Sequence, residues 1–305
     1  MKINLLSSDE YNYLKKLFLE QSNRFENVDI YTKTFPDGEH YRKIENADKI
    51  KGKPAVYICG TINDNAIFEA YNVASALVRE QCSSLHLLIP YFGYSTMERA
   101  AKEGEVVTAK NIAAMLSSLP PAPLGNFVYM LDLHSSGIPY YFEHTIHPVH
   151  LTSWPVMKKM ILSCAENPVL ASADMGRAKW VEKMGNELGL DTAYIMKKRL
   201  SGEETKVLAL NADVKGRNVV IFDDLVRSGS TLIKAAEAYK AAGAKDIHTV
   251  AVHGVFVKGA LEKMERSGLF KAVKCTNSHP NTQNLSSDLL TVYDISAEFV
   301  KELLL

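Results

Sequence analysis

Short apolar runs alternate with amphipathic segments along most of this chain. The run at 55–59 (AVYIC) precedes a segment with helical periodicity at 65–80, and the run at 218–222 (NVVIF) precedes another at 230–241. Buried strands that alternate with helices of roughly 10–15 residues are typical of βαβ units, in which the strands pair in parallel. The alternation therefore predicts an α/β fold, with mainly parallel sheets flanked by helices.

The same order of elements occurs in both halves of the chain, which we interpret as an internal duplication. Five further apolar runs continue the pattern, at 85–92, 127–133, 168–173, 192–197 and 248–256. The chain has 305 residues, which is more than one hydrophobic core usually serves. We therefore expect two domains, residues 1–150 and residues 151–305. The segment HTIHPVH at 144–150 is interpreted as an interdomain loop rather than a metal site, because Pro148 breaks any helical ladder of histidines.

Charge and cysteine content argue against several classes of protein. The chain carries 35 basic and 35 acidic side chains, so its formal net charge is zero, which disfavours nucleic acid or an anionic membrane as a partner. No apolar run approaches the roughly 18 residues of a membrane span, and the N-terminus turns polar too early for a signal peptide. The four cysteines form no CxxC pair. We expect a cytoplasmic protein that binds neither nucleic acid nor membrane.

The most informative segment is NVVIFDDLVRSGSTL at 218–232. Asp223 and Asp224 follow the apolar run, where parallel sheets bind ligands, and adjacent carboxylates can accept hydrogen bonds from vicinal hydroxyls or help to hold Mg²⁺. Backbone N–H groups and hydroxyls for an anion come next, from Ser228, Gly229, Ser230 and Thr231. A 5-phosphoribosyl group, with a phosphate at one end and a diol at the other, fits this pattern. A polar turn with an N-cap serine is the alternative.

This segment resembles the phosphoribosyl diphosphate (PRPP) loop that type I phosphoribosyltransferases share with PRPP synthetases. Phosphoribosyltransferases are usually single-domain proteins, whereas this chain is long enough for two. Its further motifs resemble those of ribose-phosphate diphosphokinases, the enzymes that make PRPP. The resemblance covers nearly the whole chain and rests on TFPDGEHYRKI (34–44), LLIPYFGYSTMERA (87–100), MLDLHSS (130–136), SADMG (172–176) and YIMKKRL (194–200).

The resemblance implies two type I phosphoribosyltransferase-like domains and transfer of the diphosphoryl group of ATP to ribose 5-phosphate with Mg²⁺, giving PRPP and AMP. The family's ATP-binding positions match Phe35, Asp37, Glu39 and Arg99. Its catalytic positions match Lys197, Arg199 and His134, and its metal positions match His134 and Asp174. Its ribose 5-phosphate positions match Asp223, Asp224, Ser228, Gly229, Ser230 and Thr231.

General chemistry agrees with these roles. An aromatic ring beside a turn, such as Phe35, can stack on a purine base. Cations such as Lys197 and Arg199 suit the oxygens of a diphosphoryl group in transfer, and Gly202 suits a mobile lid. Taken singly, each feature also has a plainer interpretation: a turn, a solvated run of cations, a structural histidine, or a helix N-cap at Asp174.

Family members place the segment around Phe35 in the ATP site of a neighbouring subunit, so the resemblance implies a homo-oligomer. Two segments depart from the commonest bacterial and animal enzymes. Thr96-Met97-Glu98-Arg99 stands where those carry Arg-Gln-Asp-Arg, and AKEGEVVTA at 101–109 replaces a more basic stretch associated with activation by phosphate. Both departures resemble the plant-type (class II) enzymes, which implies no strict dependence on phosphate.

Two other functions remain open. A phosphoribosyltransferase would consume PRPP, and the ATP-type segments of the first half argue against it. A non-catalytic subunit associated with PRPP synthetase would not need Lys197, Arg199 or His134, all of which are present. Formation of AMP and PRPP from ATP and ribose 5-phosphate would distinguish these possibilities.

Overall fold

The computed structural model describes residues 1–201, 204–210 and 212–304, and the side chains of 196–210 lie outside that description. The chain divides into two compact units: unit 1 is Met1–Thr152 with Ser296–Leu305, and unit 2 is Ser153–Ile295. The C-terminal helix α8 (Ser296–Leu304) thus belongs to unit 1, although the sequence grouped it with the second domain. Packing explains the difference, because Phe299 of α8 meets Phe18 of α1 (Asn12–Gln21) with ring centroids 6.5 Å apart.

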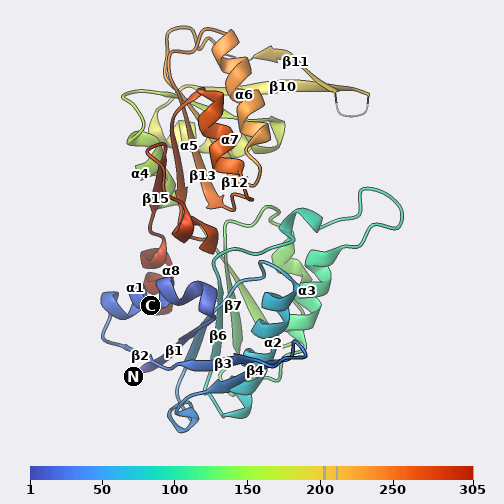
Figure 1. The fold of residues 1–305 in the computed structure, drawn as a ribbon, viewed down its shortest axis with the longest axis vertical. Coiled ribbons are helices and arrows are strands. Elements are labelled where there is room, and N and C mark those ends of the chain that lie inside the picture. Colours follow the sequence, from blue (N-terminus) through green and yellow to red (C-terminus); the bar gives the residue numbers. More distant parts are fainter. Residues whose placement is uncertain (202–203, 211, 305) are drawn as a thin grey trace. The chain divides into compact units, whose positions relative to one another are not determined.

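Unit 1 is built on a parallel sheet of six strands in the order β2-β1-β5-β6-β7-β8 (Figure 1). The strands are β1 (Ile3–Ser7), β2 (Phe25–Asn27), β5 (Ala55–Ile58), β6 (Leu85–Ile89), β7 (Asn126–Leu131) and β8 (Ile146–Leu151). Helices α2 (Asp64–Arg79) and α3 (Thr108–Ser117) pack on one face, and their apolar residues share one core with alternate residues of the central strands, such as Leu87 and Val128.

The segment at 144–150 is a strand and not the interdomain loop that its sequence suggested. It lies mostly within β8, which pairs in parallel with β7 at the edge of the sheet, with Pro148 opposite Val128. Proline has no N–H to donate, and an edge strand tolerates this because it pairs along one side alone. His150 contributes locally, since its Nε2 accepts a hydrogen bond of 3.1 Å from the Leu133 N–H.

A two-stranded hairpin extends unit 1. Strands β3 (Ile30–Thr34) and β4 (His40–Ile44) pair antiparallel, and the turn between them is closed by a 2.8 Å hydrogen bond from the Phe35 N–H to the Glu39 carbonyl. Gly38 has φ +94°, which a residue with a side chain rarely adopts. The turn predicted around Asp37 is confirmed.

Unit 2 contains a seven-stranded sheet in the order β11-β10-β9-β12-β13-β14-β15, parallel except for β11 (Figure 1). Its strands are β9 (Val169–Ser172), β10 (Thr192–Ser201), β11 (Glu204–Leu210), β12 (Val219–Val226), β13 (Ile247–Gly254), β14 (Phe270–Thr276) and β15 (Leu290–Tyr293). Its helices are α4 (Trp154–Leu162), α5 (Ala178–Leu188), α6 (Ser230–Ala241) and α7 (Ala260–Ser267). The predicted fold class, with two mainly parallel sheets flanked by helices, is confirmed.

The two faces of this second sheet are covered by different helices. Ile221 of β12 shares a core with Leu232 of α6 and Met264 of α7, whereas the next residue, Phe222, stacks on Trp180 of α5. This alternation along β12 is what a strand buried on both faces requires. None of the helices in the described part of the chain has the length and apolar character that a membrane crossing needs.

Strand β10 is longer than its apolar run indicated. The run suggested an end near residue 197, but the backbone continues to Ser201 by pairing antiparallel with β11. Hydrogen bonds to a neighbouring strand stabilise an extended backbone whatever the polarity of its side chains, so the Lys-Lys-Arg segment joins the strand. The lid expected around Gly202 lies outside the described residues.

Candidate active site

The carboxyl half of β12 carries the pair of adjacent acids. The strand does not end before them: Asp223 is still in register with Ala251 of β13, and the pairing continues to Val226. Asp224 is buried and Asp223 is half-buried, and the Asp223 Oδ1 accepts a 2.9 Å hydrogen bond from the Asp224 N–H. The two carboxylates are therefore held by a rigid strand rather than by a loop.

A short loop, Arg227–Gly229, leads from β12 into α6, which begins at Ser230. Gly229 has φ +71°, and the Ser228 hydroxyl donates a 3.2 Å hydrogen bond to the Ser230 hydroxyl. The first N–H groups of a helix have no partner within it and attract an anion. The predicted residues Ser228, Gly229, Ser230 and Thr231 thus come together at a helix N-terminus, in a form suited to a phosphate.

Arg177 is a feature of this edge that the sequence analysis missed. Its guanidinium Nη2 forms an ion pair with the Asp224 Oδ2, and the side chains are 20% and 9% exposed. Arg177 ends the 3₁₀ turn that follows β9, so parallel strands β9 and β12 bring the two residues together. A basic residue just after Asp174 was the available signal, but nothing local in the sequence pairs it with Asp224.

Asp223 differs electrostatically from its neighbour. Burial raises its pKa well above the usual value for aspartic acid, and the carboxylates of Asp224 and then Asp174 raise this pKa further. Asp174 is itself exposed and caps the 3₁₀ turn, because its Oδ1 accepts a 2.8 Å hydrogen bond from the Gly176 N–H. Asp174 therefore caps this turn and not the helix α5 that follows, whose N-cap is Arg177, and the metal role of Asp174 stays a prediction.

These carboxylates fit a hard divalent cation by the chemistry of their oxygens. Mg²⁺ in phosphoryl-transfer sites is usually held by one or two carboxylates, with substrate phosphates and water completing its shell. Asp174 and Asp223 at one sheet edge provide such a set. The described residues contain no cluster of three or more His, Cys, Asp or Glu side chains that would hold a metal unaided.

The predicted ATP residues lie in unit 1. Phe35, 38% exposed, sits at the end of the β3–β4 hairpin, where its ring is 6.2 Å from that of Tyr41 and 5.2 Å from the Lys33 Nζ. Asp37 and Glu39 are exposed in the same turn, and the Asp37 Oδ1 accepts a 3.1 Å hydrogen bond from the Glu39 N–H. The hairpin therefore presents an aromatic face and two acids to the outside.

Arg99 and His134 follow β6 and β7, on loops at the carboxyl edge of the first sheet, and both are exposed. Asp132, between β7 and His134, has φ +36°. A non-glycine residue in this region is strained, which is a common feature of functional sites. The backbone of Lys197 and Arg199 lies in β10, whereas their side chains are outside the described part of the chain.

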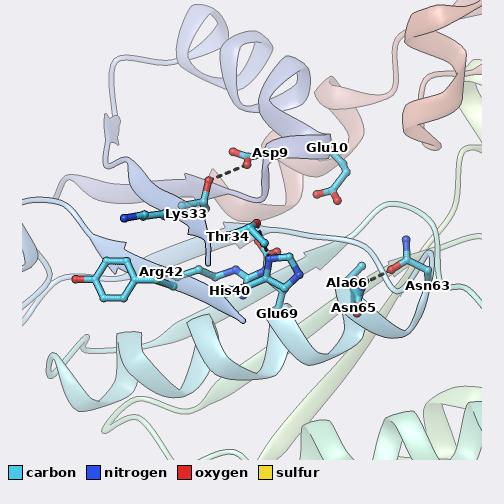
Figure 2. Close-up of a pocket in the computed structure, with 12 residues that line it drawn as sticks. Asp9, Glu10, Lys33, Thr34, His40, Arg42, Asn63, Asn65, Ala66 and Glu69 are labelled. Carbon is cyan, nitrogen blue, oxygen red and sulfur yellow. Dashed lines mark hydrogen bonds and ion pairs between the residues drawn. The ribbon is translucent and has the colours of Figure 1, made fainter. Parts of the chain in front are cut away.

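A polar pocket that the sequence did not indicate lies between the β3–β4 hairpin and the start of α2 (Figure 2). Its volume is about 330 Å³, and Asp9, Glu10 and Lys33 are among its lining residues. Arg42 and Glu69 form an ion pair of 2.5 Å in its wall, with side chains 17% and 12% exposed. Four of the lining residues belong to the segment TFPDGEHYRKI, namely Thr34, His40, Tyr41 and Arg42, whereas the others come from segments that no local pattern joins to it.

Comparison with known proteins identifies the family. Residues 3–119 match the N-terminal domain of ribose phosphate pyrophosphokinase, and residues 182–303 match the phosphoribosyl synthetase-associated domain. A ribose-phosphate pyrophosphokinase of Pyrococcus abyssi is 32% identical over 79% of this chain and 81% of its own length. Ribose-phosphate pyrophosphokinase 3, chloroplastic, of Arabidopsis thaliana is 30% identical over 87% of this chain and 64% of its own.

Similarity extends to the fold of a solved structure. Phosphoribosylpyrophosphate synthetase from Mycobacterium smegmatis has a TM-score of 0.86 at 21% identity, covering 99% of this chain and 97% of that one. The matched domains and the relatives show that the chain belongs to the ribose-phosphate pyrophosphokinase family.

Proposed function

We propose that this protein transfers the diphosphoryl group of ATP to the 1-hydroxyl of D-ribose 5-phosphate, giving PRPP and AMP. The observation that carries this proposal is the edge formed by Asp223, Asp224 and the loop before α6. It joins acceptors for a diol to donors for a phosphate, in a chain that belongs to the ribose-phosphate pyrophosphokinase family.

Ribose 5-phosphate binds at this edge in the proposed arrangement. Its phosphate accepts hydrogen bonds from the N–H groups and hydroxyls of Ser228–Thr231, and the helix dipole of α6 favours its negative charge. Its 2- and 3-hydroxyls donate to the carboxylate of Asp223. Asp224 is proposed to accept from the same hydroxyls, because a carboxylate that pairs with Arg177 through one oxygen keeps further acceptor sites.

ATP is proposed to bind through the hairpin residues Phe35, Asp37 and Glu39 together with Arg99. The exposed ring of Phe35 suits stacking on adenine. We propose that the hairpin reaches the ATP site of a neighbouring subunit, so that the working form is a homo-oligomer.

Catalysis is proposed to rest on positioning and charge neutralisation. Asp174, beside Asp223 in unit 2, and His134 in unit 1 are each proposed as ligands of Mg²⁺, which would supply Lewis-acid charge on the substrate phosphates. Lys197 and Arg199 place cations on the diphosphoryl group as it passes in line to the ribose 1-hydroxyl, where electrostatic stabilisation has the greatest effect. We also propose a cytoplasmic location, supported by four free cysteines, three of them buried.

The decisive experiment incubates the purified protein with Mg²⁺, ribose 5-phosphate and ATP labelled at the β-phosphorus. We expect AMP and labelled PRPP in equal amounts. Labelled ADP or inorganic phosphate without PRPP would contradict the proposal. A phosphoribosyltransferase would instead consume added PRPP in the presence of a nucleobase, and a non-catalytic subunit would bind ribose 5-phosphate without forming AMP.

A further inference from the structure

Helix α7 packs directly against the loop Arg227–Gly229 of unit 2, which together with Ser230 and Thr231 at the start of α6 is here called the anion loop. A side chain at Gly229 would place its Cβ 2.7 Å from the Cγ of Met264, so the loop backbone touches the helix. Two backbone hydrogen bonds of 2.9 Å tie the segment before α7 to the end of β12 and the start of the loop, from the Phe256 N–H to the Val226 carbonyl and from the Val257 N–H to the Arg227 carbonyl. The helix is therefore held in a defined position on the loop.

This position brings a lysine to the anion loop. Lys263 precedes Met264 in α7, and its Nζ donates a 2.7 Å hydrogen bond to the hydroxyl of Ser230, the first residue of α6. The Ser230 hydroxyl also accepts from Ser228, 3.2 Å away. An ammonium group thus stands beside the hydroxyls of Ser228 and Ser230 at this helix N-terminus.

The charges around the anion loop favour a cation at the position of Lys263. The hydroxyls and N–H groups of the loop are neutral donors, and the side chain of Arg227 within it is exposed, while the exposed carboxylate of Asp174 at the same edge repels a phosphate dianion. The nearby guanidinium of Arg177 is committed to Asp224. Lys263 is the cation that a described hydrogen bond holds on the loop, and lysine is well suited to bind phosphate as a compact point charge.

We infer that Lys263 is a further substrate-binding residue, which pairs with the 5-phosphate of ribose 5-phosphate. This inference rests on the proposed function, because it takes the anion at the loop to be that phosphate. In the free protein Lys263 bonds to Ser230, and in the complex its ammonium group donates to a phosphate oxygen seated on the Ser228 and Ser230 hydroxyls.

The test compares Lys263→Met, Lys263→Arg and wild type in the full chain, with Lys271→Met as the matched control. Lys271 is an exposed lysine at the opposite end of a parallel strand, β14, from the ligand-binding edge. The dissociation constant for ribose 5-phosphate is measured by calorimetry, together with the KM for ATP and the inhibition constant of inorganic phosphate against ribose 5-phosphate. Thermal unfolding reports whether each variant is folded.

Losing one hydrogen bond to a charged group corresponds to roughly 10- to 100-fold in affinity. We expect Lys263→Met to weaken the binding of ribose 5-phosphate and of inorganic phosphate by that factor, with the KM for ATP unchanged. Lys263→Arg should recover most of the lost affinity. Lys271→Met should bind both ligands as the wild type does. If the wild type binds ribose 5-phosphate and Lys263→Met binds it with the same affinity, the inference about Lys263 is overturned but the proposed function is not. An equal rise in the KM for ATP, or a lowered melting temperature that accounts for the lost affinity, would overturn the inference and indicate a structural role for Lys263. Failure of the wild type to bind ribose 5-phosphate would overturn the proposed function itself.

Discussion

Arg177 and Asp224 form an ion pair at the ligand edge of unit 2, so one of the two adjacent acids is neutralised by the protein itself. Arg177 favours the charged form of Asp224, whereas the surroundings of Asp223 disfavour its charged form, because burial and the carboxylate of Asp224 raise the pKa of Asp223. The pair of acids that looks symmetrical in the sequence is therefore divided into a paired carboxylate and one whose charge is opposed. This division gives separate predictions for the residues involved.

Arg177→Ala should destabilise unit 2. It leaves the buried Asp224 carboxylate without its cation, and breaking a buried ion pair in this way costs up to about 3–5 kcal/mol of unfolding free energy. The penalty should shrink as the pH falls, because protonation removes the uncompensated charge. Urea unfolding at several pH values measures this effect. Lys179→Ala, which removes an exposed cation two residues away, is the control, and equal stability of the two variants would refute the role of Arg177.

Asp223→Asn should stabilise the protein while weakening its binding of ribose 5-phosphate. A carboxyl group whose pKa is raised on folding favours the folded state at low pH and opposes it as the pH rises through the raised value. The advantage of the variant in urea midpoint should be absent below about pH 4, the ordinary range of an aspartic acid, and should grow toward neutral pH. Asp288→Asn, at an exposed position, is the matched control. A gain that did not depend on pH would contradict this account.

Gly229→Ala should disrupt the anion loop through packing as well as backbone strain. Its Cβ would lie 2.7 Å from the Met264 Cγ, so α7 or the loop must shift. Gly216 has the same φ of +71°, but a Cβ added there would meet no atom within 4 Å, so Gly216→Ala isolates the effect of strain. We expect at least a tenfold greater loss of ribose 5-phosphate affinity in Gly229→Ala, equivalent to about 1.4 kcal/mol. Similar affinities in the two variants would show that the contact with Met264 is unimportant.

Lys197→Ala should lower kcat by roughly 10²–10³ with little change in KM, because a cation that acts on the transferring group stabilises the transition state more than the ground state. Initial rates over a matrix of ATP and ribose 5-phosphate concentrations measure both constants. Lys198→Ala is the adjacent control. A near-normal kcat in Lys197→Ala would remove this lysine from the mechanism.

The protein should be active without inorganic phosphate. The segment at 101–109 supplies Lys102 but also Glu103 and Glu105, whose charges oppose binding of a dianion. An effector shifts a conformational equilibrium only by the difference in its affinity for the two states. A segment that binds phosphate weakly in either state provides only a small difference. Initial rates are measured against phosphate concentration at fixed ionic strength. A sigmoidal requirement for phosphate would disprove the plant-type interpretation, and we expect ADP to compete with ATP.

Local sequence pattern was sufficient for the elements that carry the site. The helical periodicity at 230–241 coincides with α6, and the pattern at 65–80 differs from α2 by one residue at each end. Such patterns depend on neighbours three or four residues apart, which the sequence displays directly. The acids at the end of β12 and the glycine and hydroxyls that follow them were identifiable for the same reason, since they lie within one short segment.

Tertiary structure decided the features that depend on distant partners. Pro148 lies in a strand only because β7 pairs with it, and α8 belongs to unit 1 only because Phe299 packs on Phe18. The contact of Arg177 with Asp224 requires β9 beside β12, and that of Lys263 with Ser230 requires α7 against the loop. By itself, the sequence determined the fold class, the family and the place of the phosphate loop. The charges that surround that loop were set by strand order and helix packing, because these bring together side chains that no local pattern relates.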